Sequence, residues 1–349
     1  MKVTASIEHT VLYRKYRPKN FAEVVGQDHV VAVLKKAIKE GTVAHAYLFS
    51  GGRGTGKTTV ARIVANELGT TSKDLYEMDA ASNRKIDDFR ELNDSVHTLP
   101  FESKYKVYII DEVHMLTKEA FNAFLKTLEE PPRHVIFILA TTEVDKLPDT
   151  IVSRCQTYTF NTPTRAVLTS AIAHVAKGEG VTLDNDAAEL IAILAEGSFR
   201  DALGTLQKVL SYSKDAKVTR SEVESVTGAP RAALINDLLS AIASGNKEQI
   251  LMQINEAMAV GVDFLTFEKL LLDRMRAVML LRNAGPMEKY IAEQFNSDDL
   301  SFLKELATQQ GSKVNSKTLA AVLKAYSETS HAYIAQLPLE IALVEALGE

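Results

Sequence analysis

The sequence has a single cysteine, Cys155, among its 349 residues. One cysteine excludes both an intramolecular disulfide framework and a zinc site built from several cysteines. No stretch approaches the ~18 consecutive apolar residues that a membrane span needs, and residues 1–10 lack the apolar centre of a secretion signal. These absences predict a cytoplasmic protein with no membrane partner.

The sequence also lacks a basic excess. Its 40 Lys and Arg residues are outnumbered by 45 Asp and Glu residues, which gives a net charge of -5. A protein that coats nucleic acid on its own normally carries more basic than acidic residues. If this chain contacts DNA, the basic surface must therefore be local or be supplied by several copies together. Charge alone neither requires nor excludes a nucleic-acid partner.

Short apolar runs alternate with helix-length segments between residues 46 and 160. In residues 117–130, apolar side chains recur on one helical face, and Pro131 and Pro132 end the segment. Alternating strands and helices predict a parallel sheet that is covered by helices on both sides. The predicted strands are residues 47–49, 75–78, 107–110, 135–140 and 156–160, with further helices after the glycine-rich stretch and over about residues 85–96.

The strand pattern stops after Phe160, and the remaining residues follow helical periodicities. Pro163 and the tripeptide Gly-Ala-Pro at residues 228–230 mark two breaks. A chain of 349 residues is long enough for two or three domains. We therefore predict an α/β core over residues 1–163, a small helical domain over residues 164–227 and a larger helical domain over residues 228–349.

Residues 51–58 read Gly-Gly-Arg-Gly-Thr-Gly-Lys-Thr and match the phosphate-loop pattern G-x-x-x-x-G-K-[ST]. The glycines allow successive backbone N–H groups to turn toward phosphates. Lys57 supplies charge to the β and γ oxygens, and the Thr58 hydroxyl ligates Mg²⁺. A glycine-rich turn would match by accident in roughly one chain in a hundred, but this match lies between a predicted strand and a predicted helix. The predicted ATP contacts here are Gly51, Gly52, Arg53, Gly54, Thr55, Gly56, Lys57, Thr58 and Thr59.

An apolar strand further along the chain ends in two carboxylates, Asp111 and Glu112. Asp111 is predicted to hold Mg²⁺ through water, and Glu112 to orient and polarise the water that attacks ATP. The alternative is that the two acids simply begin an exposed turn. The phosphate loop favours the catalytic interpretation, and the adjacent Glu separates this pattern from P-loop kinases, which transfer phosphate to an acceptor other than water.

Longer motifs add a family resemblance to these local patterns. They are residues 13–18 (Tyr-Arg-Lys-Tyr-Arg-Pro), 24–27 (Val-Val-Gly-Gln), 45–49 (His-Ala-Tyr-Leu-Phe), 111–116 (Asp-Glu-Val-His-Met-Leu), 125–132 (Leu-Lys-Thr-Leu-Glu-Glu-Pro-Pro) and 153–155 (Ser-Arg-Cys). With them the chain resembles the DNA polymerase III gamma/tau family, the ATPase motor of the bacterial clamp loader. The resemblance implies an AAA+ core with a five-stranded parallel sheet, a small helical lid and an all-helical oligomerisation collar.

The resemblance also assigns roles to single residues. Thr141, with Thr142 as the fallback, is similar to sensor 1, which reports the γ-phosphate; β-propensity alone is the alternative explanation for two threonines that close a strand. Arg154 matches the arginine finger that one subunit inserts into its neighbour's ATP site, a task that suits a planar, permanently charged guanidinium. The alternative is an exposed structural arginine. Tyr13, Arg14, Val24 and Val25 match residues that line the adenine pocket.

Arg200 matches the sensor 2 arginine of the lid, and Ser198 is a plausible N-cap for its helix. A surface salt bridge with Asp201 is the alternative. Cys155 is interpreted as a packing residue because it is a single cysteine with no partner. His45 and His114 are interpreted as local hydrogen-bonding residues because neither has the His/Asp/Glu spacing of a metal site.

One departure from the family concerns metal. The bacterial subunit usually carries a four-cysteine zinc module between the phosphate-loop helix and the second strand. Here the interval, residues 67–74, reads Glu-Leu-Gly-Thr-Thr-Ser-Lys-Asp and contains no cysteine. The expected cofactors are therefore ATP and Mg²⁺, with Thr58 and Asp111 as the magnesium residues and no zinc.

The leading hypothesis is a clamp-loader ATPase that uses ATP binding and hydrolysis to open a sliding clamp and load it onto primed DNA. Its expected partners are the clamp, primed DNA and other loader subunits in a hetero-oligomeric ring, expected to be a pentamer. An ATP-binding scaffold without turnover and a hexameric AAA+ helicase are the alternatives. Arg84, Lys85, Arg90 and Lys126 are candidate DNA contacts by resemblance, against the alternative of a solvated helix face.

Overall fold

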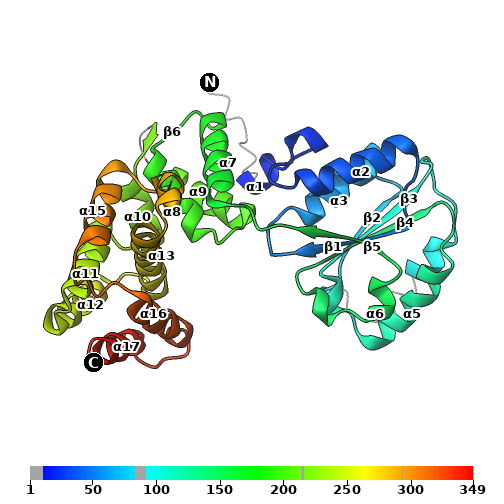
Figure 1. Ribbon diagram of the computed structural model, residues 1–349. Coiled ribbons are helices and arrows are strands. Elements are labelled where there is room, and N and C mark those ends of the chain that lie inside the picture. Colours follow the sequence, from blue (N-terminus) through cyan, green and yellow to red (C-terminus); the bar gives the residue numbers. More distant parts are fainter. Residues whose placement is uncertain (1–10, 83–91, 214–215, 293, 349) are drawn as a thin grey trace, which may run out of the picture. The chain divides into compact units, whose positions relative to one another are not determined.

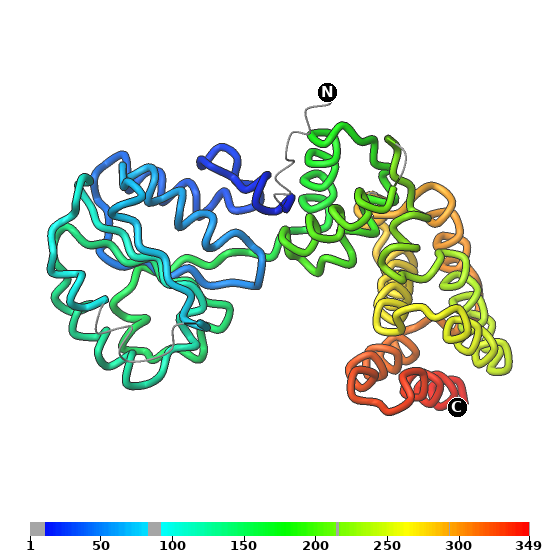
Figure 2. The backbone as a smooth tube through the Cα atoms, turned by 180° about the vertical axis from the view of Figure 1, so that it is seen from behind, coloured from blue at the N-terminus to red at the C-terminus, as the bar shows by residue number. Residues whose placement is uncertain are grey.

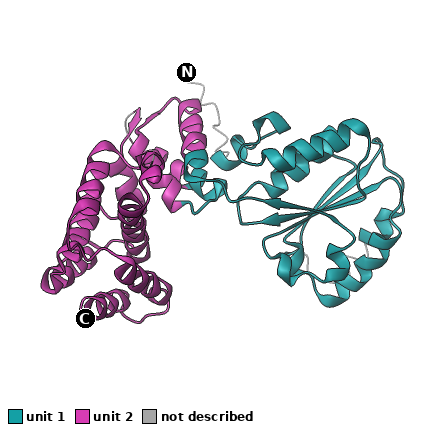
Figure 3. Cartoon of the chain, in the orientation of Figure 1, with its two compact units in different colours: residues 1–168, 195–204 teal, residues 169–194, 205–349 magenta. Residues whose placement is uncertain are grey.

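The computed structural model describes residues 11–82, 92–213, 216–292 and 294–348. The chain forms two compact units, shown in Figure 3. Unit 1 comprises residues 1–168 and 195–204, and unit 2 comprises residues 169–194 and 205–349. Within the described part of the chain, none of the helices is both long enough and apolar enough to cross a membrane.

Unit 1 is built on a five-stranded sheet in the order β2-β3-β4-β1-β5, and all of its pairings are parallel (Figure 1). The three central strands are buried almost throughout, as expected for a parallel sheet with both faces covered. All five predicted strands are confirmed. Their bounds are β1 (Ala46–Gly51), β2 (Leu75–Asp79), β3 (Lys106–Asp111), β4 (Val135–Thr141) and β5 (Gln156–Phe160).

Helices cover both faces of this sheet, as Figure 1 shows. Because successive strand residues point to opposite faces, Ile138 of β4 joins the cluster of residues under α2 and α3, whereas Phe137 joins the cluster under α5. Phe124 of α5 packs edge-on against Phe137, with 5.0 Å between ring centroids. The helical segments are α1 (Leu12–Lys15), η1 (Phe21–Glu23), α2 (Asp28–Glu40), α3 (Lys57–Glu67), η2 (Val113–Met115), α5 (Lys118–Glu129), η3 (Val144–Lys146) and α6 (Asp149–Val152).

The helix predicted over residues 117–130 is confirmed as α5, whose N-cap Thr117 accepts a hydrogen bond from the Ala120 N–H. Of the helix predicted over residues 85–96, residues 92–96 are helical and the earlier part lies outside the described residues.

Unit 2 is mostly helical, and its longest helix, α13, contacts α11, α15 and α16. The C-terminal helices α16 and α17 lie side by side, as Figures 1 and 2 agree. The helices after β5 are α7 (Arg165–Gly178), α8 (Asn185–Leu194), α9 (Phe199–Tyr212), α10 (Arg220–Thr227), α11 (Ala232–Ser244), α12 (Lys247–Val260), α13 (Phe264–Asn283), η4 (Gly285–Met287), α14 (Glu288–Ala292), α15 (Ser297–Thr308), α16 (Ser316–Thr329) and α17 (Leu337–Ala346).

A short parallel pair, β6 (Thr182–Leu183) and β7 (Lys217–Val218), interrupts the helices of unit 2. The prediction that strands end at Phe160 missed this pair. Strands of two residues are too short to produce the alternation on which strand prediction depends.

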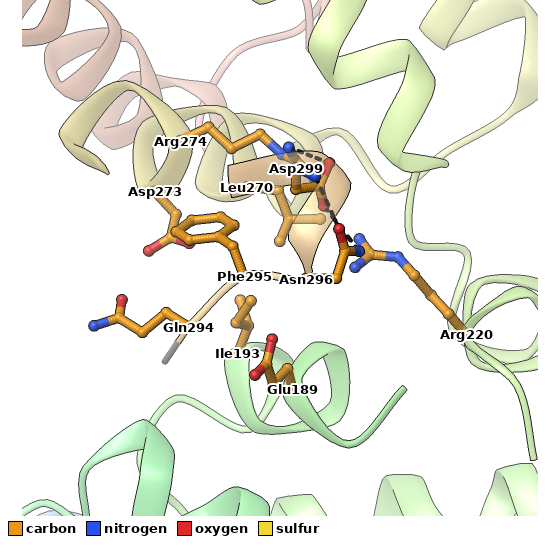
Figure 4. Close-up of a pocket in the computed structure, with 10 residues that line it drawn as sticks. All are labelled: Glu189, Ile193, Arg220, Leu270, Asp273, Arg274, Gln294, Phe295, Asn296 and Asp299. Carbon is orange, nitrogen blue, oxygen red and sulfur yellow. Dashed lines mark hydrogen bonds and ion pairs between the residues drawn. The ribbon is translucent and has the colours of Figure 1, made fainter. Parts of the chain in front are cut away.

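A buried ion pair stabilises unit 2 beside a small pocket, shown in Figure 4. The Arg274 guanidinium donates to both oxygens of the Asp299 carboxylate, each at 2.8 Å, and to the Asn236 Oδ1 at 2.7 Å. Burial by itself would raise the pKa of Asp299, but the hydrogen bonds and charge of Arg274 lower it. The pocket is lined by Glu189, Ile193, Arg220, Leu270, Asp273, Arg274, Gln294, Phe295, Asn296 and Asp299.

Candidate nucleotide-binding site

The phosphate loop lies at the same end of the sheet as the predicted catalytic residues that close β3 and β4. The strand order places β4 between β3 and β1, so Asp111, Thr141 and Gly51 close three neighbouring parallel strands. Ser50 pairs with Thr141 in register, which puts the last residue of β4 beside the start of the loop. In open parallel sheets, ligands bind at the carboxyl ends of the strands.

The phosphate loop has backbone positions that only glycine fits. Gly51 has a φ of +145°, and a Cβ on it would lie 2.4 Å from the Phe160 carbonyl oxygen. Gly54 has a φ of +70°, and its Cβ would lie 2.1 Å from the Ser198 Oγ. The 11-residue helix α3 then begins at Lys57 and directs its free N–H groups toward the loop.

Lys57 is buried within the loop it belongs to. Its Nζ donates to the carbonyl oxygens of Gly51 and Gly52, both at 2.7 Å. Burial lowers the pKa of Lys57, and the nearby carboxylates of Glu112 and Asp111 oppose this shift. The ammonium group is thus held among the backbone dipoles of the loop.

The two predicted magnesium residues are in direct contact. The Thr58 hydroxyl donates to the Asp111 Oδ2 at 2.7 Å, although the two residues are 53 positions apart in the sequence. A hydroxyl and a carboxylate are the oxygen ligands that Mg²⁺ prefers, with the nucleotide and water completing its shell. The residues present therefore fit a magnesium ion bound together with ATP. Among the residues that the structure describes, no group of three or more His, Cys, Asp and Glu side chains is placed to hold a metal ion.

Glu112 has left-handed backbone angles, with φ of 48° and ψ of 44°. Its Oε2 accepts a hydrogen bond from the Thr142 hydroxyl at 3.2 Å. Thr141 is fully buried, and its Oγ1 lies 3.0 Å from the His114 Nδ1. The two threonines therefore have different neighbours, because Thr142 contacts the predicted catalytic carboxylate and Thr141 contacts a histidine that the sequence suggested only as a local hydrogen-bonding residue.

Two further residues connect this site to distant parts of the chain, and sequence reasoning did not assign them. The Arg17 Nε donates to the Thr59 Oγ1 at 3.1 Å, and burial, with repulsion from Arg62, lowers the pKa of Arg17. The Gln27 amide donates to the Asn161 carbonyl at 2.8 Å and lies 3.4 Å from the Thr55 carbonyl. Both residues belong to motifs on which the family resemblance rests, and membership in those motifs is the sequence signal that could have identified them.

The predicted adenine residues lie on the segment before the sheet. Tyr13 is half-buried in α1 and Arg14 is exposed. Val24 packs against the apolar cluster beneath α2 and α3, whereas the side chain of Val25 is 50% exposed. The role of these four residues in binding adenine stays a prediction.

The start of α9 packs against the phosphate loop within unit 1. The Phe199 N–H donates to the Gly54 carbonyl at 3.1 Å, and the Ser198 Oγ accepts from the Asp201 N–H at 3.2 Å, which is the predicted N-cap contact. Arg200 is exposed in the first turn, with its guanidinium carbon 6.0 Å from the centre of the Tyr13 ring. Its charge is close enough to Lys57 to lower the pKa of that lysine.

Arg154 lies at the opposite end of the sheet from the phosphate loop, where the parallel strands begin. It precedes β5, whose first residue, Gln156, pairs with Tyr47 at the amino end of β1. Its guanidinium forms an ion pair with Glu129 at 2.6 Å and donates to the Thr150 carbonyl at 2.8 Å. Four strand residues, about 13 Å, separate this end of the sheet from the phosphate loop.

The remaining predicted residues have simpler surroundings. Burial raises the pKa of Cys155 to about 12, so its thiol stays protonated as it packs against the cluster under α5. Lys126 is exposed on α5. The other candidate DNA contacts, Arg84, Lys85 and Arg90, lie outside the described residues.

The fold and the site together define a P-loop protein of the AAA+ class. A solved structure with this fold is the Thermotoga maritima RuvB Holliday junction branch migration motor, with a TM-score of 0.53 at 24% sequence identity over 71% of this chain and 86% of that chain. At that identity the likeness concerns the fold alone.

The sequence comparisons place the chain more narrowly. The family DNA polymerase III, delta subunit, matches residues 26–83 and 70–164, and DNA polymerase III subunits gamma and tau domain III matches residues 218–348. The chain is 36% identical to the DNA polymerase III subunit gamma/tau of Mycobacterium bovis, over 96% of this chain and 62% of that protein. It is 32% identical to the DNA polymerase III subunit gamma of Buchnera aphidicola, over 98% of this chain and 99% of that protein. The chain belongs to the DNA polymerase III gamma/tau family, and the sequence resemblance is confirmed.

Proposed function

We propose that this chain is the ATPase motor subunit of a bacterial clamp loader within the DNA polymerase III holoenzyme. Family membership supports the assembly, and the contact between Thr58 and Asp111 beside the phosphate loop carries the ATPase assignment. The chain spans 62% of the length of its Mycobacterium bovis relative, so activities of the longer protein are part of the proposal.

In the proposed reaction, the loop N–H groups and Lys57 bind the phosphates, and Lys57 exchanges its two carbonyl partners for β and γ oxygens. Thr58 would ligate a magnesium ion and Asp111 would hold it through water, and the ion would supply positive charge that offsets the charge of the phosphates. Glu112 orients the attacking water once Thr142 releases its carboxylate. Thr141 and Arg200 respond to the γ-phosphate from β4 and α9.

Arg154 completes the site of a neighbouring subunit in this proposal. Its position at the end of the sheet opposite its own phosphate loop supports a role in the ATP site of another chain. The division into a core (residues 1–163), a lid (164–227) and a collar (228–349) stays part of the proposal.

Exposed apolar residues in unit 2 support the collar role. Leu337, Ile341 and Val344 recur on one face of α17 and are 42%, 48% and 37% exposed. This spacing of four and three residues produces an apolar stripe on the exposed side of α17.

A second exposed apolar segment, in unit 1, supports a protein partner such as the clamp. Leu99 and Phe101 are 78% and 75% exposed on the loop before β3. The Asp74 carboxylate accepts hydrogen bonds from the backbone of Phe101, Glu102 and Ser103. Burial alone would raise the pKa of Asp74, but these hydrogen bonds lower it to about 2. The loop is therefore held in place with its apolar side chains outward.

The test of this function separates binding from turnover. Lys57→Ala should abolish binding of a fluorescent ATP analogue, whereas the matched variant Lys39→Ala, at an exposed helix position, should bind normally. Glu112→Gln should bind ATP and fail to hydrolyse it in an assembly with loader subunits, clamp and primed DNA. Unchanged affinity of Lys57→Ala would overturn the nucleotide assignment.

The same experiment addresses the alternatives. Normal clamp loading by Glu112→Gln would favour an ATP-binding scaffold. A helicase is disfavoured because residues 218–348 match gamma and tau domain III, and the described part of this region forms helices α10 to α17.

A further inference from the structure

His114 stands between the predicted sensor and two carboxylates. Its Nδ1 lies 3.0 Å from the Thr141 Oγ1 and 3.6 Å from the Glu112 Oε2, and its Nε2 lies 3.2 Å from the Glu143 Oε1. Its side chain is only 5% exposed. The short helix η2 starts directly after Glu112, and this fixes the imidazole beside the end of β4.

The hydrogen bonds around this imidazole determine where its proton lies. A glutamate is ionised at neutral pH, and a hydrogen bond from Lys146 lowers the pKa of Glu143 further, so this carboxylate can only accept. The His114 Nε2 must therefore carry the proton, and in a neutral imidazole Nδ1 is then an acceptor. In that tautomer the donor to Nδ1 is the Thr141 hydroxyl, whose oxygen accepts from the Glu143 N–H at 3.0 Å.

In this tautomer Glu112 makes no hydrogen bond to His114. A carboxylate and an unprotonated Nδ1 are both acceptors, so they cannot bond to each other across 3.6 Å. The Glu112 Oε2 instead accepts from Thr142 at 3.2 Å. Both threonine protons are thus committed, one to the histidine and one to the carboxylate.

The geometry points to His114 as a positioning residue that turns the Thr141 hydroxyl proton away from the nucleotide, with Glu143 fixing the histidine tautomer that does so. This inference rests on the proposed role of Thr141 as the γ-phosphate sensor. Phosphate oxygens are acceptors, so Thr141 must give up its bond to His114 in order to donate to a γ-phosphate. The histidine then competes with ATP, and not with ADP, for one proton.

The expected effect follows from the net value of one hydrogen bond. Removing the competing acceptor in His114→Phe should raise the preference for a non-hydrolysable ATP analogue over ADP by about 2- to 10-fold. ADP affinity should stay unchanged, which serves as the internal control for a folding defect. In a Thr141→Val background, His114→Phe should have no effect on the preference, because the proton in question is gone.

A second arm reads the tautomer without any nucleotide. Side-chain ¹⁵N NMR of the free protein should show His114 protonated on Nε2, and Glu143→Ala should reduce that form and raise the preference for the ATP analogue. Lys146→Ala is the matched control, since it removes the other partner of Glu143 at 2.7 Å but leaves His114 in contact.

The outcomes distinguish failure of the inference about His114 from failure of the proposed function. An Nδ1-protonated His114 in the wild type, or an unchanged nucleotide preference in both His114→Phe and Glu143→Ala, would overturn the inference. A wild-type protein that binds neither nucleotide would overturn the proposed function, while the tautomer measurement would still decide the position of the proton.

Discussion

Replacing Arg154 by alanine should damage ATP hydrolysis in the assembly while leaving the subunit itself almost unchanged. Among the residues that the structure describes, Arg154 forms an ion pair with Glu129, and the two side chains are 33% and 50% exposed. Such surface pairs stabilise a protein by about 0–1 kcal/mol. The hydrogen bond to the Thr150 carbonyl contributes about 1 kcal/mol more. We expect Arg154→Ala to lower the free energy of unfolding by no more than about 2 kcal/mol and to bind ATP with unchanged affinity.

The expected loss in turnover is much larger. An arginine finger in comparable phosphoryl-transfer enzymes contributes on the order of 10³-fold or more, which corresponds to about 4 kcal/mol of transition-state stabilisation. An arginine with only a structural role would change turnover by a small factor. The two explanations are therefore separated by orders of magnitude.

The assay is ATP turnover of a reconstituted loader with clamp and primed DNA. Glu129→Gln is the matched control, because it removes the same ion pair and leaves the guanidinium. Arg154→Ala subunits mixed with Glu112→Gln subunits should recover some turnover at interfaces where an intact finger meets an intact site. Full activity of Arg154→Ala alone, or no recovery in well-formed mixed assemblies, would refute the reasoning.

Two further predictions concern unit 2. Arg274→Met leaves the Asp299 carboxylate buried without its bidentate partner, so urea unfolding should show a free energy of unfolding lower by about 3–5 kcal/mol. Adding Asp299→Leu should restore most of this stability. A decrease below about 1 kcal/mol would contradict the prediction. Burial, opposed by a hydrogen bond from Thr329, raises the pKa of Glu268 to about 7. The folded state then binds more protons than the unfolded state, and stability falls as pH rises from about 4.5 to 7. Glu268→Gln should be more stable at pH 8 by up to about 3 kcal/mol and similar to the wild type below pH 4.5, and equal stability at pH 8 would argue against the buried acid.

The sheet was predictable because its strands are continuous apolar runs of the kind that a parallel sheet buries on both faces. The phosphate loop was predictable because its residues are consecutive, so one stretch of sequence contains the whole motif. Asp111 was interpretable only in combination with that loop, and the structure places it 2.7 Å from Thr58.

The contacts that sequence reasoning missed join residues far apart along the chain. Gln27 and Asn161 are separated by 134 positions, and periodicity carries no information about such pairs. Residues 195–204 belong to unit 1 because Ser198 and Phe199 pack on Gly54, an approach that a single glycine in the loop makes possible. The division into three predicted domains stays a prediction.

Because the five strands are parallel, the geometry of each chain affects how many complete ATP sites an assembly of such chains contains. In each chain the phosphate loop lies at the carboxyl ends of the strands and Arg154 lies at their amino ends. If Arg154 acts in a neighbour, every contact joins two different faces, which is a heterologous interface. A row of such chains has a front and a back. When the row closes into a ring, complete sites equal subunits in number; when it stays open, one terminal chain has a phosphate loop that no finger reaches.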